Sequence, residues 1–434
     1  MVPQEIANTP VASAVSAGHP SSLRTALAGL IGNVLEWFDF AVYGYFAGDI
    51  GQQFFPQSSP DAQQLLTFAI FAIGFFARPL GSLALGMIGD RVGRRALLTL
   101  SIALMGGSTI VIGLLPTYQQ IGVTAPLLLV VMRLIQGFSV GGEFTGSMVY
   151  TTESSSSLMR GLISSSTAAG TTIGFILGSG AAWLINSLLT PQQVLAWGWR
   201  VPFLASIIFS ILGWLLRRGL HETEEGRKAV EKRPPLVASL VADWLPMLRT
   251  FGILAATNAA YYLTFTYVVE RRKNLPGGGS AFLLANTLSL FAVLIAKPFG
   301  GWLSDRVGRR RLMLVLNTAI VILIVPVFRL MLHGTPQQFV VGQILLAIPI
   351  GMALGLQGAM VVEIFPLRTR VTSMSIAYSV TLALAGGTAP LVSAWIIEKF
   401  GQPLAPAYYL MLHGLIGLAL MWPMAETNNR RLDE

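Results

Sequence analysis

The sequence predicts an all-α polytopic membrane protein with twelve transmembrane helices arranged as two six-helix halves. Apolar residues make up 53% of the 434 residues and charged residues only 11%, whereas soluble domains carry about 25% charged residues. Apolar spans of about 20 residues, the length that crosses a bilayer, recur along the chain. The charged hexamer Asp90–Arg95 returns as Asp305–Arg310, close to half the chain length away. This repetition indicates two related halves.

The chain divides into two tails, two halves and a linker. Residues 1–22 are small and polar without an apolar core, so we expect a disordered tail and no cleavable signal sequence. We expect the first half over 23–217, a linker over 218–248, the second half over 249–424 and a tail over 425–434. The twelve predicted spans are 23–47, 64–88, 97–116, 124–150, 162–188, 199–217, 249–271, 280–303, 312–331, 337–362, 371–395 and 404–424.

Basic residues give the orientation of these spans. Each hexamer lies between two apolar spans and is predicted to be a short loop at the membrane surface. Twenty of the 29 Lys and Arg residues lie on the tails and on alternate loops, and five lie on the opposite loops. This asymmetry predicts that both termini and both hexamers are cytoplasmic. It also explains the net charge of +9 without nucleic acid as a partner.

Several chemistries are excluded or unsupported. The chain has no cysteine, which excludes disulfides, thiolate metal sites and cysteine nucleophiles. Its glycine-rich runs lack the Gly-Lys-Ser/Thr ending of a phosphate loop, so we expect no nucleotide energy source. No nucleophile–base pair or metal-ligand set stands out. We therefore predict neither an enzyme nor a resident cofactor.

Longer strings carry a family resemblance. The Gly-x-x-Gly/Ser-Asp-Arg-x-Gly-Arg-Arg pattern around both hexamers resembles the signature of the major facilitator superfamily. Four further stretches resemble the metabolite:proton symporter family within it. They are 32–44 with Glu36-Trp37-Phe38-Asp39, Arg78-Pro79-Leu80-Gly81, 133–143 with Ser139-Val140-Gly141-Gly142-Glu143, and Trp197-Gly198-Trp199-Arg200-Val201-Pro202-Phe203.

The resemblance implies a bacterial inner-membrane symporter that works by alternating access. Its members import organic acids or zwitterionic osmolytes such as proline and betaine, and the proton gradient supplies the energy without a cofactor. The expected partners are a small substrate, protons and the lipid bilayer. We expect the protein to function as a monomer.

Two carboxylates in the first span are candidates for proton coupling. Glu36 and Asp39 are three residues apart and share a helix face, which Tyr43 continues. Carboxylates inside a span are costly, and burial with mutual repulsion favours a group that binds and releases a proton. Asp39 is the deeper candidate. The alternative is that one or both form structural ion pairs, or that Glu36 is an anchor near the cytoplasmic end.

The fourth span adds Arg133 and Glu143. Arg133 is a candidate partner of Asp39 or Glu36, either as a mobile charge or in a permanent ion pair. Glu143 follows Arg133 by ten residues, about 15 Å along a helix. It is either a second acid or a polar packing residue among glycines.

Candidate substrate residues are spread over several spans. Arg78 and Lys297 either attract an anionic substrate or line the inner part of their helices and help the cytoplasmic gate. Span seven carries hydroxyl and aromatic groups that either bind a carboxylate, stack on a quaternary ammonium, or pack and anchor the helix. These are Asn258, Tyr261, Tyr262, Thr264, Thr266 and Tyr267, with Tyr43, Thr167, Thr171, Thr172 and Gln357 as further candidates. His413 in the last span is expected to be a packed polar residue.

The hexamers and a second repeat form a candidate cytoplasmic gate. Glu153…Arg160 after span four returns as Glu363…Arg370 after span ten. An acid there can pair with a basic residue or cap the next helix, and glycine permits a tight turn. The alternative is that these loops only fix topology. The gate candidates are Asp90, Arg91, Gly93, Arg94, Glu153, Arg160, Asp305, Arg306, Gly308, Arg309, Glu363 and Arg370.

The intramembrane cations Arg78, Arg133 and Lys297 favour an organic acid as the substrate. A zwitterionic osmolyte is the alternative within the family, and a drug or metabolite exporter is the alternative within the superfamily. Osmosensing relatives often carry a long C-terminal coiled coil, whereas about ten residues follow the last span here. That difference counts modestly against the osmolyte class.

Overall fold

The computed structural model describes residues 22–92, 94–141, 143–217, 236–274, 279–428, 430 and 432. Within these ranges, side chains are described except at 22–29, 31, 86–98, 143 and 216–217. The side chains of the predicted gate residues Asp90, Arg91 and Arg94, all of Gly93, and the side chain of Glu143 therefore lie outside the described part.

The described residues form helices with no β-strand, and each of the twelve predicted spans contains a helix. The first half, up to residue 217, contains α1 (Ser22–Tyr45), α2 (Ala47–Phe54), α3 (Pro60–Val92), α4 (Arg94–Leu114), α5 (Tyr118–Ile121), α6 (Thr124–Val140), α7 (Glu143–Glu153), α8 (Arg160–Leu188), α9 (Pro191–Gln193), the π-helix η1 (Val194–Gly198) and α10 (Arg200–Arg217). The second half contains α12 (Leu236–Ala242), α13 (Trp244–Tyr262), the π-helix η2 (Leu263–Tyr267), α14 (Val268–Asn274), α15 (Ser280–Val307), α16 (Arg309–His333), α17 (Pro336–Ile364), α18 (Arg370–Thr381), the π-helix η3 (Leu382–Gly387), α19 (Ala389–Phe400) and α20 (Ala405–Met421).

Several of these helices are long and apolar enough to cross a bilayer. Among the described residues, seven meet both criteria, and two bent pairs bring the number to nine. Two shorter apolar helices, Thr99–Leu114 and Ala405–Met421, occupy the predicted third and last spans. The range predicted as a linker, 218–248, contains α12, which meets the span 244–274 at a bend of 67°.

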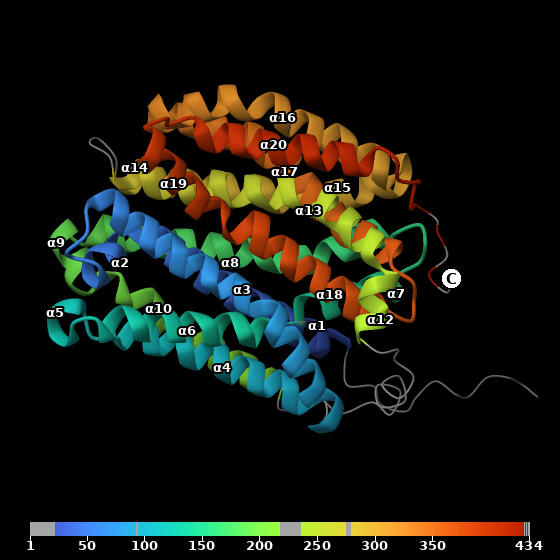
Figure 1. The fold of residues 1–434 in the computed structure, drawn as a ribbon, viewed down its shortest axis with the longest axis horizontal. Coiled ribbons are helices and arrows are strands. Elements are labelled where there is room, and N and C mark those ends of the chain that lie inside the picture. The colour runs from blue at the N-terminus through green and yellow to red at the C-terminus, as the bar shows by residue number, and fades with distance from the viewer. Residues whose placement is uncertain are drawn as a thin grey trace, which may run out of the picture.

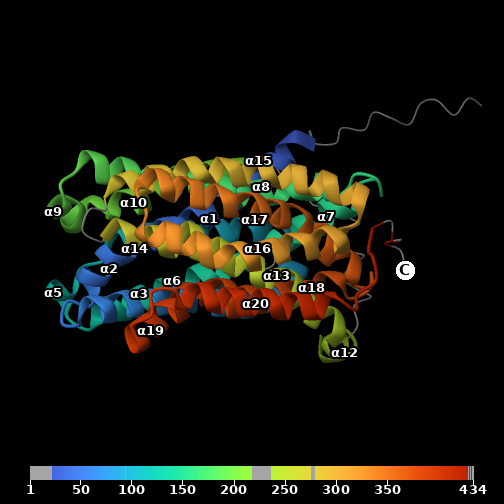
Figure 2. The ribbon, with the colours of Figure 1, turned by 90° about the horizontal axis from the view of Figure 1, so that it is seen from above.

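The long helices run side by side along one axis (Figure 1). Helices α4, α6 and α10 lie on one side of the bundle, and α16 and α20 lie on the other (Figure 1). The seam between the halves is formed largely by α8 against α15 and α17, and by α3 against α18 and α19. Both views place α2, α5 and α9 at one end and α7 and α12 at the other (Figure 2). We call the second end, where both hexamers lie, the signature end.

The hexamers are not loops, because their charged residues lie on helix ends. Asp305, Arg306 and Val307 continue α15, and α16 begins at Arg309. The turn is Gly308 alone, at φ +100°, a backbone conformation that favours glycine. In the first copy, α3 ends at Val92 and α4 begins at Arg94. In the second copy, this one-residue turn places the charged residues on the ends of two adjacent helices.

Candidate functional site

Asp39 lies in a fully buried layer between α1, α4 and α6. Its Oδ2 contacts the Thr109 hydroxyl, and Gln136 Nε2 donates to the same hydroxyl at 2.6 Å. Arg133 donates from Nη1 to Gln136 Oε1 at 2.9 Å. The guanidinium lies 4.5 Å from the ring centroid of Phe40. Arg133 therefore reaches Asp39 through two neutral side chains, and the expectation of a direct pair is wrong for this conformation.

Tyr43 belongs to the same layer. Its ring lies 4.3 Å below the Arg133 guanidinium, and its hydroxyl donates to the Thr67 carbonyl at 3.3 Å. Tyr43 therefore supports Arg133 within the first half. The contacts described for its side chain all lie within the first half.

Glu36 pairs with Arg78, one helix turn from Asp39. Arg78 Nη1 lies 3.1 Å from Glu36 Oε1, and both side chains are buried. The Arg78 guanidinium also lies over the rings of Phe75, Phe40 and Trp37, with centroids at 4.3, 4.6 and 5.3 Å. Its Nε and Nη2 atoms have no hydrogen-bond partner among the described residues. Glu36 thus compensates the charge of Arg78, and two N–H donors of Arg78 remain available beside the aromatic rings.

Aromatic rings from both halves meet at mid-depth in the seam. Tyr262 of α13 lies 5.5 Å from Phe75 of α3 and 6.4 Å from Trp37 of α1, between ring centroids. Phe175 of α8 lies 4.8 Å from Tyr261 and 6.0 Å from Trp37. The remaining contacts run from Trp37 to Phe144 at 6.1 Å and from Phe144 to Tyr378 at 5.5 Å. We call Trp37, Phe75, Phe144, Phe175, Tyr261, Tyr262 and Tyr378 the aromatic enclosure.

Lys297 joins the halves at the seam between α15 and α8. Its Nζ donates to the Ala168 carbonyl at 2.6 Å and to the Thr171 hydroxyl at 2.8 Å. The side chain is buried, and its partners in the structure are neutral. Gln357 of α17 is also buried, and its Oε1 has no partner among the described residues.

The other predicted polar residues differ in their hydrogen-bond partners. Phe265 in η2 accepts from the Tyr45 hydroxyl at 2.8 Å, while the hydroxyls of Thr264, Thr266 and Tyr267 are buried without a described partner. Asn258 donates back to Leu254, and Thr167 contacts Thr151. His413 packs against Tyr409 and binds its carbonyl, as expected for a packed polar residue.

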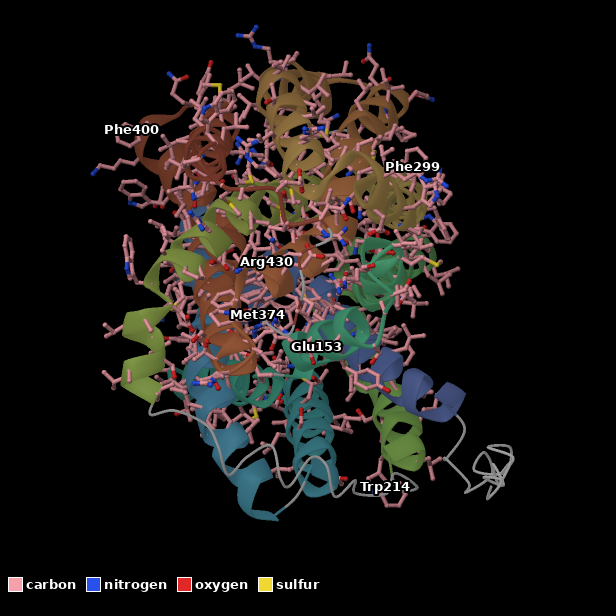
Figure 3. The ribbon with its side chains drawn as sticks, turned by 90° about the vertical axis from the view of Figure 1, so that its right-hand side faces the viewer. Glu153, Trp214, Phe299, Met374, Phe400 and Arg430 are labelled. Atoms are coloured by element: carbon pink, nitrogen blue, oxygen red, sulfur yellow. The ribbon has the colours of Figure 1, made fainter. Side chains whose placement is uncertain are left out.

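The second repeat crosses the seam reciprocally at the signature end. Glu153 of the first half binds Arg370 of the second at 2.6 Å. Arg160 of the first half lies 3.9 Å from Glu363 of the second. Each acid thus faces the base of the other copy. Figure 3, a view onto this end, shows Glu153 near the middle of the face, between the halves.

Asp305 links the second hexamer to the other half. Its carboxylate accepts from the backbone N–H groups of Gly161 and Leu162 at 2.8 and 3.0 Å, at the N-terminus of α8. It also pairs with Arg309, whose Nε binds Glu363 at 2.6 Å. An anion at a helix N-terminus is stabilised by the helix dipole. Asp305 therefore caps a helix of the opposite half and not the helix that follows it.

Arg306 does not join this cluster. It is exposed, and its guanidinium stacks on the ring of Trp302 at 3.9 Å. The predicted role of Arg306 in the gate has no contact to support it in this conformation.

The C-terminal segment completes the signature end, which the sequence did not predict. Glu426 accepts from the backbone N–H groups of Arg309 and Arg310 at 2.7 and 3.1 Å, which caps α16. Partial burial alone would raise the pKa of Glu426, but these backbone donors hold it below its usual range. Arg430 and Leu432 offer carbonyls to Arg160 and Arg370 of the gate. Figure 3 shows Arg430 and Glu153 on this same face.

A second charged cluster closes the opposite end. Lys273 of α14 lies 2.9 Å from Asp49 of α2 and 3.2 Å from Glu270, and it also donates to the Tyr45 carbonyl. Glu270 accepts from the Gly48 backbone N–H at 2.7 Å. These contacts join the two halves. Asp49 directly follows the apolar stretch 40–48, and that signal could have drawn attention to it.

The described residues contain no group of three His, Cys, Asp or Glu side chains that could hold a metal ion. The polar features are instead spread along the seam in layers. From the signature end inward they are the gate, Lys297, the aromatic enclosure with Arg78 and, at the opposite end, the Lys273 cluster.

Known proteins share both the sequence and the fold. A family model described as "Sugar (and other) transporter" matches residues 25–229, and one described as "Major Facilitator Superfamily" matches residues 277–432. A proline/betaine transporter of Escherichia coli K12 is 36% identical over 94% of this chain and 85% of its own length. A glycine betaine/proline/ectoine/pipecolic acid transporter of Dickeya dadantii is equally similar. An ectoine/proline transporter of Corynebacterium glutamicum is 34% identical over 95% of this chain and 86% of its own length.

Solved structures show the same fold at low identity. A D-xylose–proton symporter superposes with a TM-score of 0.74 at 18% identity, over 94% of this chain and 99% of that one. A partially occluded inward-open structure of the E. coli xylose transporter gives 0.74 at 17% identity, with the same coverage. The protein is thus a transporter and not an enzyme, and the chain belongs to the metabolite:proton symporter family of the major facilitator superfamily.

Proposed function

We propose that the protein is a proton-coupled importer of a small zwitterionic osmolyte of the proline or betaine type. The observation that carries this proposal is the aromatic enclosure, which both halves build together. The faces of Trp, Tyr and Phe rings attract cations such as the quaternary ammonium group. The guanidinium of Arg78 already lies over three rings at this level, so the site suits a cation.

The polar neighbours of the enclosure suit the other end of a zwitterion. The unpartnered Nε and Nη2 atoms of Arg78 offer a fork to a carboxylate. Glu36 compensates the charge of Arg78, so the site has no excess positive charge from this pair. A solute that is neutral overall but carries both charges therefore fits better than a net anion.

The same contacts weaken the organic-acid interpretation. Arg78 is paired with Glu36, Arg133 is enclosed within the first half, and Lys297 is held by α8. Arg78 is the cation beside the enclosure, and Glu36 compensates its charge, whereas Arg133 and Lys297 bind neutral groups outside the enclosure. The relatives named above are described as transporters of proline, betaine, ectoine or pipecolic acid, all of which are zwitterions.

The two charged ends support transport by alternating access. In the present conformation, the gate joins the halves at the signature end, and the Lys273 cluster joins them at the other end. Opening either end requires its inter-half pairs to separate while the other set holds. We place the signature end and both termini on the cytoplasmic side of the inner membrane, because basic residues concentrate there.

Asp39 is the proposed proton site. It is buried, its Oδ1 has no described hydrogen-bond partner, and it lies one turn from the pair of Glu36 and Arg78. A carboxyl that is protonated while its site is closed, and ionised when the site opens to water, moves one proton in each transport cycle. The shared helix α1 connects this event to Trp37 and Phe40 beside Arg78.

Competition for uptake tests the substrate class. Proteoliposomes loaded at alkaline pH should take up labelled glycine betaine, and excess proline or ectoine should compete whereas succinate and citrate should not. Tyr262→Ala should raise the KM for glycine betaine roughly two- to thirty-fold, the range of a cation–π contact of about 0.5–2 kcal/mol. The matched control Tyr408→Ala removes an exposed tyrosine of α20 and should leave the KM unchanged. Competition by succinate without competition by proline would refute the proposal.

A further inference from the structure

The two neutral side chains between Arg133 and Asp39 form a hydrogen-bonded bridge with a fixed direction. Arg133 donates to Gln136 Oε1 at 2.9 Å, and Gln136 Nε2 donates to Thr109 Oγ1 at 2.6 Å. Thr109 Oγ1 contacts Asp39 Oδ2 and lies 2.8 Å from the Met105 carbonyl. The side chains of Arg133, Gln136, Thr109 and Asp39 are all fully buried.

The chemistry of the donors determines how this bridge is oriented. A guanidinium only donates, so Gln136 must present its carbonyl oxygen to Arg133 and its amide N–H to Thr109. The hydroxyl oxygen of Thr109 therefore accepts. Its single hydrogen remains for one of two acceptors, the Met105 carbonyl or Asp39.

Two arrangements of protons satisfy this geometry. With Asp39 ionised, the Thr109 hydroxyl donates to the carboxylate. With Asp39 protonated, the carboxyl O–H donates to Thr109, whose own hydrogen turns to the Met105 carbonyl. Only the second arrangement uses both acceptor positions of Thr109 as well as its hydrogen. It also avoids a fully buried carboxylate ion that no described cation contacts directly.

On the basis of the proton site proposed above, we infer that Thr109 and Gln136 are positioning residues of proton coupling. In the closed conformation they hold Asp39 protonated, with the Thr109 hydroxyl turned to Met105. When the proton leaves to water, no covalent bond changes other than the O–H bond of Asp39. The Thr109 hydroxyl then turns to the new carboxylate and stabilises it.

Other charged groups face this site from the neighbouring helices. Glu36 of α1 and Arg133 of α6 act on Asp39. Tyr43 of α1, Arg78 of α3 and Tyr262 of α13 act on Arg133 at the other end of the bridge. Arg78 compensates the charge of the Glu36 carboxylate. Arg133 acts on Asp39 through Gln136, whose amide dipole points its N–H group away from the guanidinium. Thr109 contacts Asp39 directly, so removing its hydroxyl by mutation is the most specific test of the bridge.

The test is infrared difference spectroscopy on the full-length protein in liposomes, following the protonated-carboxyl band as the pH changes. Asp39→Asn identifies the band by removing it. Thr109→Val keeps the shape of Thr109 but removes the hydroxyl. Hydrogen bonds to a charged acceptor are stronger than those to a neutral one. Thr109→Val therefore destabilises ionised Asp39 more than protonated Asp39. The midpoint should rise by about one pH unit, a tenfold change in proton affinity.

Thr109→Ser restores the hydroxyl and should return the midpoint to that of the wild type, which a role in packing alone would not predict. The pH profile of glycine betaine uptake should move with the band. A wild-type midpoint in Thr109→Val would overturn the inference while leaving Asp39 as the proton site. Undiminished gradient-driven accumulation in Asp39→Asn would instead remove the proton site on which the inference rests.

Discussion

At the scale of single residues, the contacts at the signature end depend on partners that lie far apart in the sequence. Glu426 caps α16 by accepting from Arg309 and Arg310, although more than a hundred residues separate them. Gly308 permits this close approach, since a Cβ at that position would meet Glu426 Oε2 at 2.5 Å. The last residues of the chain therefore hold the second hexamer in place.

Glu426→Gln should weaken this cap and lower stability by about 1 kcal/mol at neutral pH. Because the pKa of Glu426 is lowered on folding, its contribution is present above the ordinary Glu value of about 4.3 and is lost as the pH falls through the folded value. Thermal unfolding of the purified protein at pH 7 and at acid pH checks this. The difference between wild type and variant should shrink in acid, and a difference that grows there would contradict it.

Charge type and spacing predicted which residues matter but not how they pair. Glu153, Arg160, Glu363 and Arg370 meet across the seam because an internal repeat places equivalent residues opposite one another. Gln136 was not among the residues singled out from the sequence, yet it lies between Arg133 and Asp39. Its position three residues after Arg133, on the same helix face, was the available signal. Thr109 lies on another helix, and its contact with Asp39 required the fold.

At the scale of the helices, α3 and α6 approach so closely that backbone meets backbone. A Cβ on Gly137 would lie 1.8 Å from the carbonyl oxygen of Gly74, and one on Gly141 would lie 2.1 Å from the backbone nitrogen of Ser82. Small residues allow such contact between transmembrane helices. This packing holds Arg133 of α6 against the aromatic rings of α1 and α3.

Gly137→Ala should therefore destabilise the protein by about 1–3 kcal/mol, the cost of overpacking. The matched control is Gly107→Ala on α4, where a Cβ meets nothing within 4 Å. That change should be neutral or slightly stabilising, because alanine favours helix over glycine. Melting temperatures of the two variants in the same detergent decide the matter, and equal effects would show that the α3–α6 contact has been misjudged.

The existence of the helices was predictable, and their ends were less so. Hydropathy identified twelve spans because about 20 apolar residues in a row have few alternatives to a membrane helix. It misjudged the hexamers as loops, because the buried partners that hold Asp305 and Arg309 on helix ends lie elsewhere in the chain. It also missed α2 and α12, which are shorter than a span. The breaks at η2 and η3 carry no sequence pattern that periodicity alone detects.

At the scale of the whole molecule, transport requires the two ends to open in turn. The Lys273 cluster buries one cation between two carboxylates, so removing the cation leaves like charges together. Breaking a buried pair in this way costs about 3–5 kcal/mol. Opening at this end should therefore become easier when Lys273 is replaced.

A single-cysteine variant can report that opening, because the chain has no native cysteine. Ala47→Cys lies on the buried face of α2 beside the cluster and should react slowly with a membrane-impermeant maleimide. Adding Lys273→Met should speed the reaction. The exchange Asp49→Lys with Lys273→Asp keeps the charges and should slow it again. Equal labelling rates in Ala47→Cys alone, with Lys273→Met and with the charge exchange would show that the cluster does not close this end.

The central claim is that a proton bound at Asp39 drives the accumulation of a zwitterionic solute. The most direct measurement compares gradient-driven accumulation of labelled glycine betaine with counterflow exchange at equal pH, in proteoliposomes of the wild type and of Asp39→Asn. We predict that the wild type accumulates glycine betaine until a protonophore collapses the gradient. Asp39→Asn should exchange without accumulating. Accumulation that survives the protonophore, or that is equal in both proteins, would contradict the account.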